Sequence, residues 1–170
     1  MDPENPIPRR TALAALASAA VGGTLYALNN REPAPRFTAT TLDGEKFTND
    51  SVKGKVVLLQ FWATWCQYCR RDQPAVDSIV HDFPGTLVVL AIDVGESKKK
   101  VRQYLDDSPR ACKIVLTENT NLAAMYAAKS FPLYVVIDKD GNIAGTQRGA
   151  GGENSLRRLL KKAGLAAESE

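Results

Sequence analysis

Long runs of apolar residues are the clearest pattern in this chain. Residues Val56–Trp62 are apolar at every position except Gln60, and Thr86–Asp93 and Leu133–Ile137 contain two further apolar runs. Runs of this length, rich in valine, leucine and isoleucine, predict strands that are buried on both faces of a sheet. A shorter strand is predicted at Lys113–Leu116.

Between the strands, the apolar residues take the spacing of three or four that is typical of helices. The first helix is predicted to follow Cys66 and Cys69 and to run to about His81, with Pro74 kinking it near its start. The other predicted helices are a segment that Ser97 caps and that ends near Asp106, Asn121–Lys129 and Glu153–Ala163.

Two turn sequences predict hairpins. Strands at Phe37–Thr41 and Lys46–Thr48 flank an Asp-Gly turn, and Asp138–Gly141 connects Leu133–Ile137 to a last strand at Asn142–Arg148. Strands that alternate with helices and finish in a hairpin predict a mixed sheet with helices on both faces, which is an α/β architecture.

Composition and charge place the chain among ordinary globular proteins. It has 170 residues, of which 44% are hydrophobic and 24% charged, and its formal net charge is +3. Its densest basic stretches, Lys98–Lys100 and Arg157–Lys162, contain no aromatic residues of the kind that stack on nucleic-acid bases. We therefore expect solvated helix faces there and no nucleic-acid partner.

The N-terminal segment has the layout of an export signal. Arg9 and Arg10 precede an uncharged, alanine-rich stretch from Thr11 to Leu28. This stretch is either a cleaved signal or a retained membrane anchor; we favour the anchor, and the arginine pair leaves twin-arginine export open. In both cases the basic end stays inside, so the rest of the chain is expected outside the cytoplasm.

These patterns divide the chain into four parts. Residues 1–30 are the predicted signal sequence or membrane anchor, and residues 31–35, with two prolines, are a predicted extended linker. One folded domain is expected over residues 36–165, followed by a short tail at residues 166–170.

The chemistry is expected at Trp65-Cys66-Gln67-Tyr68-Cys69, where a buried strand gives way to a helix. A thiol at a helix N-terminus faces unpaired N–H groups and the positive end of the helix dipole, both of which favour the thiolate. Cys66 is therefore the expected nucleophile. Cys69 lies one turn further along, where it can resolve a mixed disulfide with Cys66.

Two other interpretations of the cysteine pair are weaker. A zinc site needs four ligands, and the chain offers only Cys112 and His81 besides the pair, without ligand-like spacing. A purely structural disulfide would close too short a loop to restrict the unfolded chain much. We expect Cys112 to be a buried spectator and His81 to interact with the end of its helix.

With this order of elements, the chain resembles the membrane-anchored, extracytoplasmic thioredoxin-like oxidoreductases of the TlpA/ResA type. The resemblance covers about Arg36–Gly164. It rests on linked motifs: the Asp-Gly hairpin turn, Gly54-Lys55-Val56-Val57, Phe61-Trp62-Ala63-Thr64-Trp65-Cys66, Pro74, Phe131-Pro132 and Ile137-Asp138-Lys139-Asp140-Gly141.

The resemblance implies a thioredoxin-like fold, with a mixed central sheet, helices on both faces and an added N-terminal β-hairpin. It also implies a cis-proline at Pro132 that faces the dithiol, with the backbone of Phe131 pairing with an extended substrate segment. Trp65, beside the nucleophile, would provide an apolar platform for protein substrates. Together, Trp65, Phe131 and Pro132 are the expected substrate-binding residues.

Three positions depart from common patterns of this fold. Gln60 stands where thioredoxin has a buried aspartate, and it cannot take a proton. Asp72 stands where several relatives have a glutamate, and it is the candidate for shuttling protons to Cys69, although an acid there is also a favourable partner for the helix dipole. Tyr68 replaces the usual proline.

The sequence thus predicts an extracytoplasmic thiol-disulfide oxidoreductase that acts on protein thiols or disulfides through Cys66 and Cys69. It needs no metal or organic cofactor beyond this redox-active disulfide. The family's usual physiology implies a membrane dithiol donor and a place in cytochrome c maturation. The alternatives are a thiol peroxidase, and a copper-delivery or non-catalytic module of the same fold.

Overall fold

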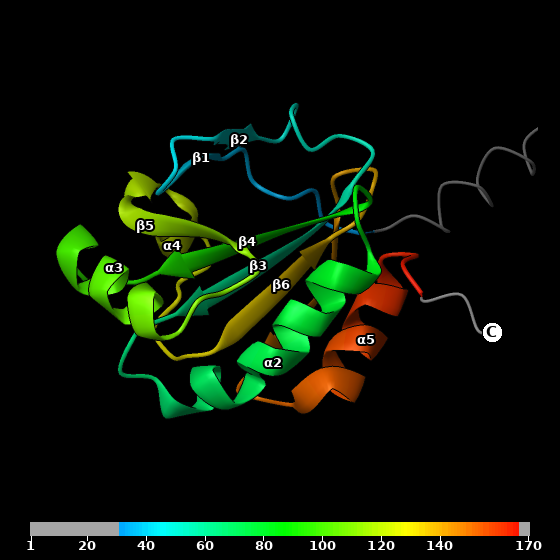
Figure 1. Ribbon diagram of the computed structural model, residues 1–170. Helices are drawn as coiled ribbons and strands as arrows, with labels where there is room; N and C mark the ends of the chain where they lie inside the picture. The colour runs from blue at the N-terminus through cyan, green and yellow to red at the C-terminus, as the bar shows by residue number, and fades with distance from the viewer. Residues whose placement is uncertain (1–30, 167–170) are drawn as a thin grey trace, which may run out of the picture. The chain divides into compact units, whose positions relative to one another are not determined.

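The computed structural model describes residues 31–166, which form a seven-stranded sheet with helices on both sides (Figure 1). The strand order is β2-β1-β5-β4-β3-β6-β7. Predicted features of residues 1–30 and 167–170, including the signal or anchor, lie outside the described residues. In the described part no helix is long and apolar enough to cross a membrane.

Strand β3 (Val56–Trp62) lies inside the sheet, between β4 and β6, and every one of its residues is buried. It pairs in parallel with β4 (Leu87–Asp93) along its whole length. On its other edge it pairs antiparallel with β6 (Leu133–Ile137). The predicted mixed sheet with buried apolar strands is confirmed.

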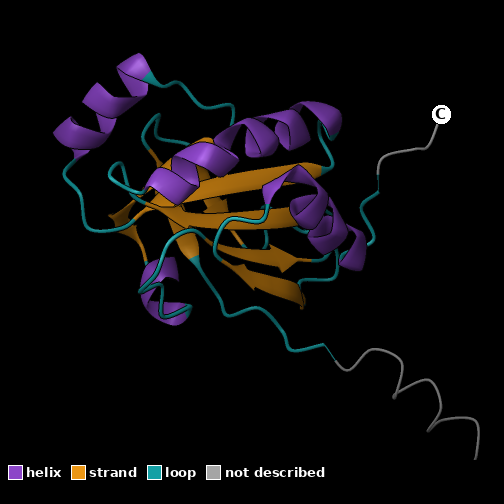
Figure 2. Ribbon diagram, turned by 90° about the horizontal axis from the view of Figure 1, so that it is seen from below, coloured by secondary structure: helices purple, strands orange, loops and turns teal. Residues whose placement is uncertain are grey.

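The helices form two unequal layers (Figure 2). One face of the sheet carries α2 (Gln67–Asp82), α3 (Lys98–Asp107) and α5 (Gly152–Lys162), and the other face carries the short helix α4 (Leu122–Met125). Alternate residues of β3 supply the two cores, since Leu58 and Trp62 pack under the larger helices and Leu59 and Phe61 pack on the opposite side.

The remaining strands form hairpins at the two edges of the sheet. Strands β1 (Thr38–Thr41) and β2 (Lys46–Thr48) make the predicted N-terminal hairpin. At the other edge, β7 (Ile143–Arg148) pairs antiparallel with β6. The Asp138 carboxylate accepts backbone N–H bonds from Asp140 and Asn142, which hold the turn between these two strands.

Two predicted elements have different lengths in the structure. Strand β5 (Lys113–Thr120) is longer than the predicted Lys113–Leu116, because β1 pairs with its far half, with Ala39 opposite Thr120. Helix α4 is shorter than the predicted Asn121–Lys129. It ends because Ala127 takes a left-handed conformation, with a φ of 46°, that a helix cannot continue.

Residues 31–35 are extended but do not behave as a free linker. The N–H of Ala34 donates to the carbonyl oxygen of Gly141, and Pro33 forms a β-bridge with Asn142. The guanidinium of Arg31 donates to the Asp138 carboxylate and to the carbonyl oxygen of Lys162. This segment therefore satisfies its polar groups against the turn between β6 and β7 and the end of α5.

Candidate active site

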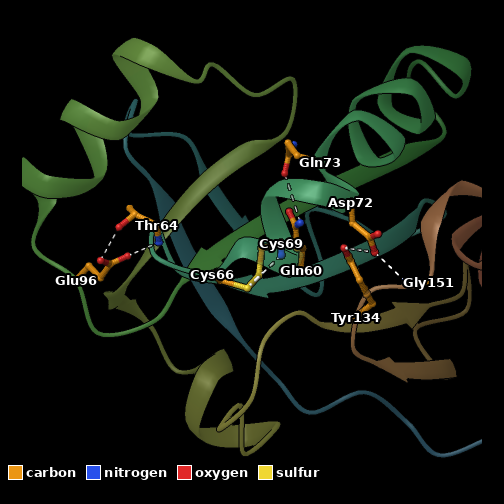
Figure 3. The surroundings of a disulfide bond; sticks show 9 residues. All are labelled: Gln60, Thr64, Cys66, Cys69, Asp72, Gln73, Glu96, Tyr134 and Gly151. Atoms are coloured by element: carbon orange, nitrogen blue, oxygen red, sulfur yellow. Dashed lines mark hydrogen bonds between the residues drawn. A yellow bond between two sulfur atoms is a disulfide. The ribbon is translucent and has the colours of Figure 1, made fainter.

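Cys66 and Cys69 form a disulfide at the N-terminus of α2 (Figure 3). Cys66 is the N-cap residue, and its Sγ accepts the backbone N–H of Cys69 at 3.1 Å. Cys66 keeps 4% of its surface exposed, whereas Cys69 has none. Of the two bonded cysteines, the one that keeps some exposed surface thus also receives an N–H of the helix N-terminus on its sulfur, which favours a negative charge there.

The peptide bond between Phe131 and Pro132 is cis, as the resemblance implied. The N–H of Gly149, just after β7, donates to the carbonyl oxygen of Pro132 at 2.8 Å and so anchors this bend. The ring of Phe131 lies 5.8 Å from the ring of Trp65, centroid to centroid, in an edge-on arrangement. The structure therefore brings Trp65, Cys66 and the Phe131-Pro132 bend together from distant parts of the sequence.

Apolar surface is concentrated next to the disulfide. Among the described residues, the large hydrophobic side chains that remain exposed are Trp65 (63%), Tyr68 (49%) and Met125 (41%). Two of these three flank Cys66 in the sequence. Exposed aromatic side chains of this kind are typical of protein-binding surfaces.

Asp72 is almost completely buried and points toward α5 (Figure 3). One carboxylate oxygen accepts the hydroxyl of Tyr134 at 3.3 Å and the N–H of Gly151 at 3.0 Å. The other oxygen accepts the N–H of Gly152 at 3.1 Å. Its carboxylate thus ties α2 to the start of α5 and to strand β6, and its role in proton transfer stays a prediction.

Gln60 and Cys112 contact polar side chains of α2, which we call the dithiol helix because it begins at the two cysteines. The amide of Gln60 donates to Gln73 at 3.4 Å, and Gln73 in turn donates to Asp77 at 2.8 Å and to the sulfur of Cys112 at 3.9 Å. Burial raises the pKa of the Cys112 thiol to about 11. The prediction that Cys112 is buried is confirmed, and its raised pKa favours the protonated, less reactive thiol at neutral pH.

A pair of acids beside the active-site loop was missed in the sequence. The carboxylate of Glu96 accepts both the backbone N–H and the hydroxyl of Thr64, two residues before Cys66, and Lys100 forms an ion pair with it at 2.6 Å. Burial acts to raise the pKa of Glu96, but the bonds from Lys100 and Thr64 lower it to about 2. Asp93, the last residue of β4, is fully buried next to it.

The position of these acids follows from the parallel pairing of β3 with β4 in the structure. The carboxyl ends of parallel neighbouring strands meet at one edge of a sheet, so acids that follow β4 come close to the loop that follows β3. Burial and the nearby charge of Glu96 raise the pKa of Asp93 from 3.8 to about 7.

A second feature that the sequence did not reveal is the position of Arg110. Its guanidinium carbon lies 3.5 Å from the centroid of the Trp62 ring and 5.6 Å from that of Tyr104. The three guanidinium nitrogens are buried and have no hydrogen-bond partner within residues 31–166. The aromatic faces are thus the main stabilising contacts of this cation, behind the last residue of β3.

Metal ligands do not gather in this part of the chain. Among the described residues, no group of three or more histidine, cysteine, aspartate or glutamate side chains is placed to hold a metal ion.

The AhpC/TSA family matches residues 31–146, which is more than half of the chain. The chain belongs to the AhpC/TSA family. It is 35% identical to the thioredoxin-like protein YneN of Bacillus subtilis over 66% of this chain and 67% of that one. It is also 30% identical to the thiol-disulfide oxidoreductase ResA of Geobacillus thermodenitrificans, over 79% of this chain and 82% of the relative.

Solved structures support the fold. A putative thiol:disulfide interchange protein DsbE from Chlorobium tepidum superposes with a TM-score of 0.70, at 21% identity, over 80% of this chain and 98% of that one. Within its family, the chain is thus a thioredoxin-like protein of the ResA type and a thiol-disulfide oxidoreductase. Its predicted fold class and enzyme class are confirmed.

Replacing Asp93 with asparagine should make stability less dependent on pH. Between pH 4 and pH 7 the folded protein holds a proton on Asp93 that the unfolded chain lacks, so its free energy of unfolding falls as the pH rises. Asparagine does not ionise, so the stability of Asp93→Asn relative to the unmodified protein should rise by about 2 kcal/mol between pH 5 and pH 8.

Urea unfolding of the oxidised proteins at several pH values measures this difference. The exposed Asp140 provides the control, since Asp140→Asn should give a difference that does not change over the same range. A flat difference for Asp93→Asn would show that Asp93 is already ionised at pH 5.

Proposed function

We propose that this chain exchanges disulfides with exported proteins, with Cys66 as the attacking thiol and Cys69 as the resolving thiol. The observation that carries the proposal is the contrast between the two sulfurs. Cys66 caps the helix and accepts an N–H bond on its sulfur, whereas Cys69 is shielded completely. Of the two sulfurs, the one that an outside thiol attacks is therefore that of Cys66.

The exchange proceeds in two steps. In the reducing direction, the Cys66 thiolate attacks one sulfur of a substrate disulfide, forms a mixed disulfide and releases the other substrate sulfur as a thiolate. Cys69, once deprotonated, then attacks the Cys66 sulfur and releases the second substrate thiolate. Two electrons pass from the dithiol to the substrate, and the intramolecular disulfide seen in the structure is formed again.

The Phe131-Pro132 bend is placed to hold the substrate during the exchange. The peptide groups of Phe131 make no backbone hydrogen bond outside the regular elements of the described chain, and β6 begins only at Leu133. An extended substrate segment can pair with this free backbone while its side chains contact Trp65. Trp65, Phe131 and Pro132 are accordingly our proposed substrate-binding residues.

The location and the physiological partners rest on the sequence. The basic N-terminus followed by an uncharged stretch supports export, with retention in the membrane as an anchor. A membrane dithiol donor and apocytochrome c cysteines are the partners that the resemblance to ResA-type proteins supports.

Alkylation of the reduced protein tests the assignment of the two sulfurs. We expect a single fast-reacting thiol at pH 7, lost in Cys66→Ser and retained in Cys69→Ser, because the N–H groups at the start of α2 favour the Cys66 thiolate. Cys112 serves as the internal control, since its buried thiol should remain unlabelled. A faster reaction at Cys69 or Cys112 would contradict the assignment.

Cys69→Ser also tests the activity itself. Without the resolving thiol, the variant should accumulate mixed disulfides with its protein substrates on Cys66. Rapid consumption of hydrogen peroxide by the reduced protein, without such trapped species, would instead favour a thiol peroxidase.

Protease treatment of spheroplasts tests the location. Protease added from outside should degrade the folded body while cytoplasmic marker proteins survive. Protection of the body would contradict export. A mature N-terminus near Ala20 would contradict only the membrane anchor.

Proton transfer by Asp72 is a separate part of the proposal. Asp72→Asn cannot carry a proton, so release of substrate from the mixed disulfide should slow by about tenfold or more at pH 6 to 7. Tyr134→Phe is the matched control, since it removes a hydrogen bond to the same carboxylate and leaves the carboxylate in place. Equal slowing in both variants would show that Asp72 acts only by positioning α2.

A further inference from the structure

Four exposed cations belong to the elements that carry the disulfide and the cis-proline bend. Arg70 and Arg71 directly follow Cys69 in the first turns of α2, and both are exposed. Lys129 is exposed in the segment that leads to the Phe131-Pro132 bend, and Arg148 is exposed at the end of β7. We call these four residues the basic rim.

The members of the basic rim lie on or next to the elements that carry the disulfide and the cis-proline bend. The guanidinium of Arg71 lies over the exposed ring of Tyr68, 5.2 Å from its centroid. Arg148 of β7 pairs with Leu133 of β6, and Leu133 directly follows Pro132 in the sequence. Lys129 lies two residues before Phe131. The cations thus approach the site from both sides, from the dithiol helix and from the cis-proline bend.

No carboxylate neutralises these cations. Within residues 31–166, none of the four rim residues forms an ion pair. The acids nearest to the active-site loop are engaged elsewhere, since Glu96 binds Thr64 and Lys100. Asp72 and Asp93 are buried. The surface around the disulfide is therefore positively charged although the net charge of the whole chain is only +3.

We infer that the preferred substrates are proteins in which acidic residues flank the reacting cysteine. The inference rests on the proposed function and specifies its substrate class. Exposed single charges contribute little to affinity, but several of one sign around a site raise the association rate of oppositely charged partners about 10- to 1000-fold. The exposed rings of Trp65 and Tyr68 supply apolar contact once the acidic segment has docked.

Three disulfide-bonded peptides of equal length, with glutamate, serine or lysine beside the cysteine, test the inference. The full-length protein is reduced, freed of reductant and mixed with each peptide, and the second-order rate constant of exchange is measured. At low ionic strength, the glutamate peptide should react about tenfold or more faster than the lysine peptide. This ratio should fall steeply as salt is added, because salt screens exposed charges.

Variants of the basic rim separate electrostatic attraction of the substrate from changes in the reactivity of the two active-site sulfurs. Any effect of Arg70 and Arg71 on the Cys66 thiolate is common to all three peptides and cancels in the ratio of their rates. The double variant Arg70→Glu/Arg71→Glu should abolish or reverse the preference, and the neutral Arg70→Gln/Arg71→Gln should weaken it. Glutamates in the first turns of a helix are compatible with its dipole, so both variants should fold.

Arg158→Glu/Lys161→Glu is the matched control. Both residues are exposed on α5, beside Phe83 beyond the far end of α2, so the same change of charge there should leave the ratio unaltered. A ratio near one in the unmodified protein, or an equal change in both double variants, would overturn the inference. Exchange with the serine peptide reports on the proposed function itself, and its absence would refute that function instead.

Discussion

The pairing of β3 on both of its edges is the constraint on which the active site depends. Trp62 stands opposite Asp93 in the parallel pair with β4, and Phe61 stands opposite Leu133 in the antiparallel pair with β6. Because β6 runs against β3, the chain enters β6 at the edge of the sheet where it leaves β3. The dithiol helix and the cis-proline bend are therefore neighbours although more than sixty residues separate them. A slip of one residue in either pair would turn a whole strand to the wrong face and separate them.

Buried polar residues hold the dithiol helix and the loop before it in place. Asp72 binds the first N–H groups of α5 and the Tyr134 hydroxyl, so the dithiol helix cannot move without moving α5 and β6. Glu96 holds Thr64 and thereby the loop that presents Cys66. Such bonds are costly to leave unmade in a core, because a buried polar group without a partner has lost its water. The active-site loop is consequently held at both ends.

The surface of the site combines apolar and cationic groups at short range. Trp65 and Tyr68, on either side of Cys66 in the sequence, stay exposed in the described chain. Exposed aromatic rings give contact area to many partners, whereas the charges of the basic rim discriminate between partners by attraction or repulsion. General contact and electrostatic selection thus come from different residues.

Local patterns along the chain were sufficient for the buried strands, for α2 and for the assignment of Cys66 and Cys69 to a strand-to-helix junction, because periodicity and capping act over a few residues. The length of β5 and the packed state of residues 31–35 were decided by partners that arrive from distant parts of the chain. The same is true of the acids. The residues next to Asp72 in the sequence do not predict that it binds the N-terminus of α5, and those next to Glu96 do not predict that it binds Thr64. The position of Arg110 over Trp62 likewise exists only once the sheet is assembled. The sequence by itself determined which elements and which reactive sulfurs this protein has. Only the tertiary structure decided which buried group each polar side chain meets, because such contacts depend on the packing of the helices on the sheet.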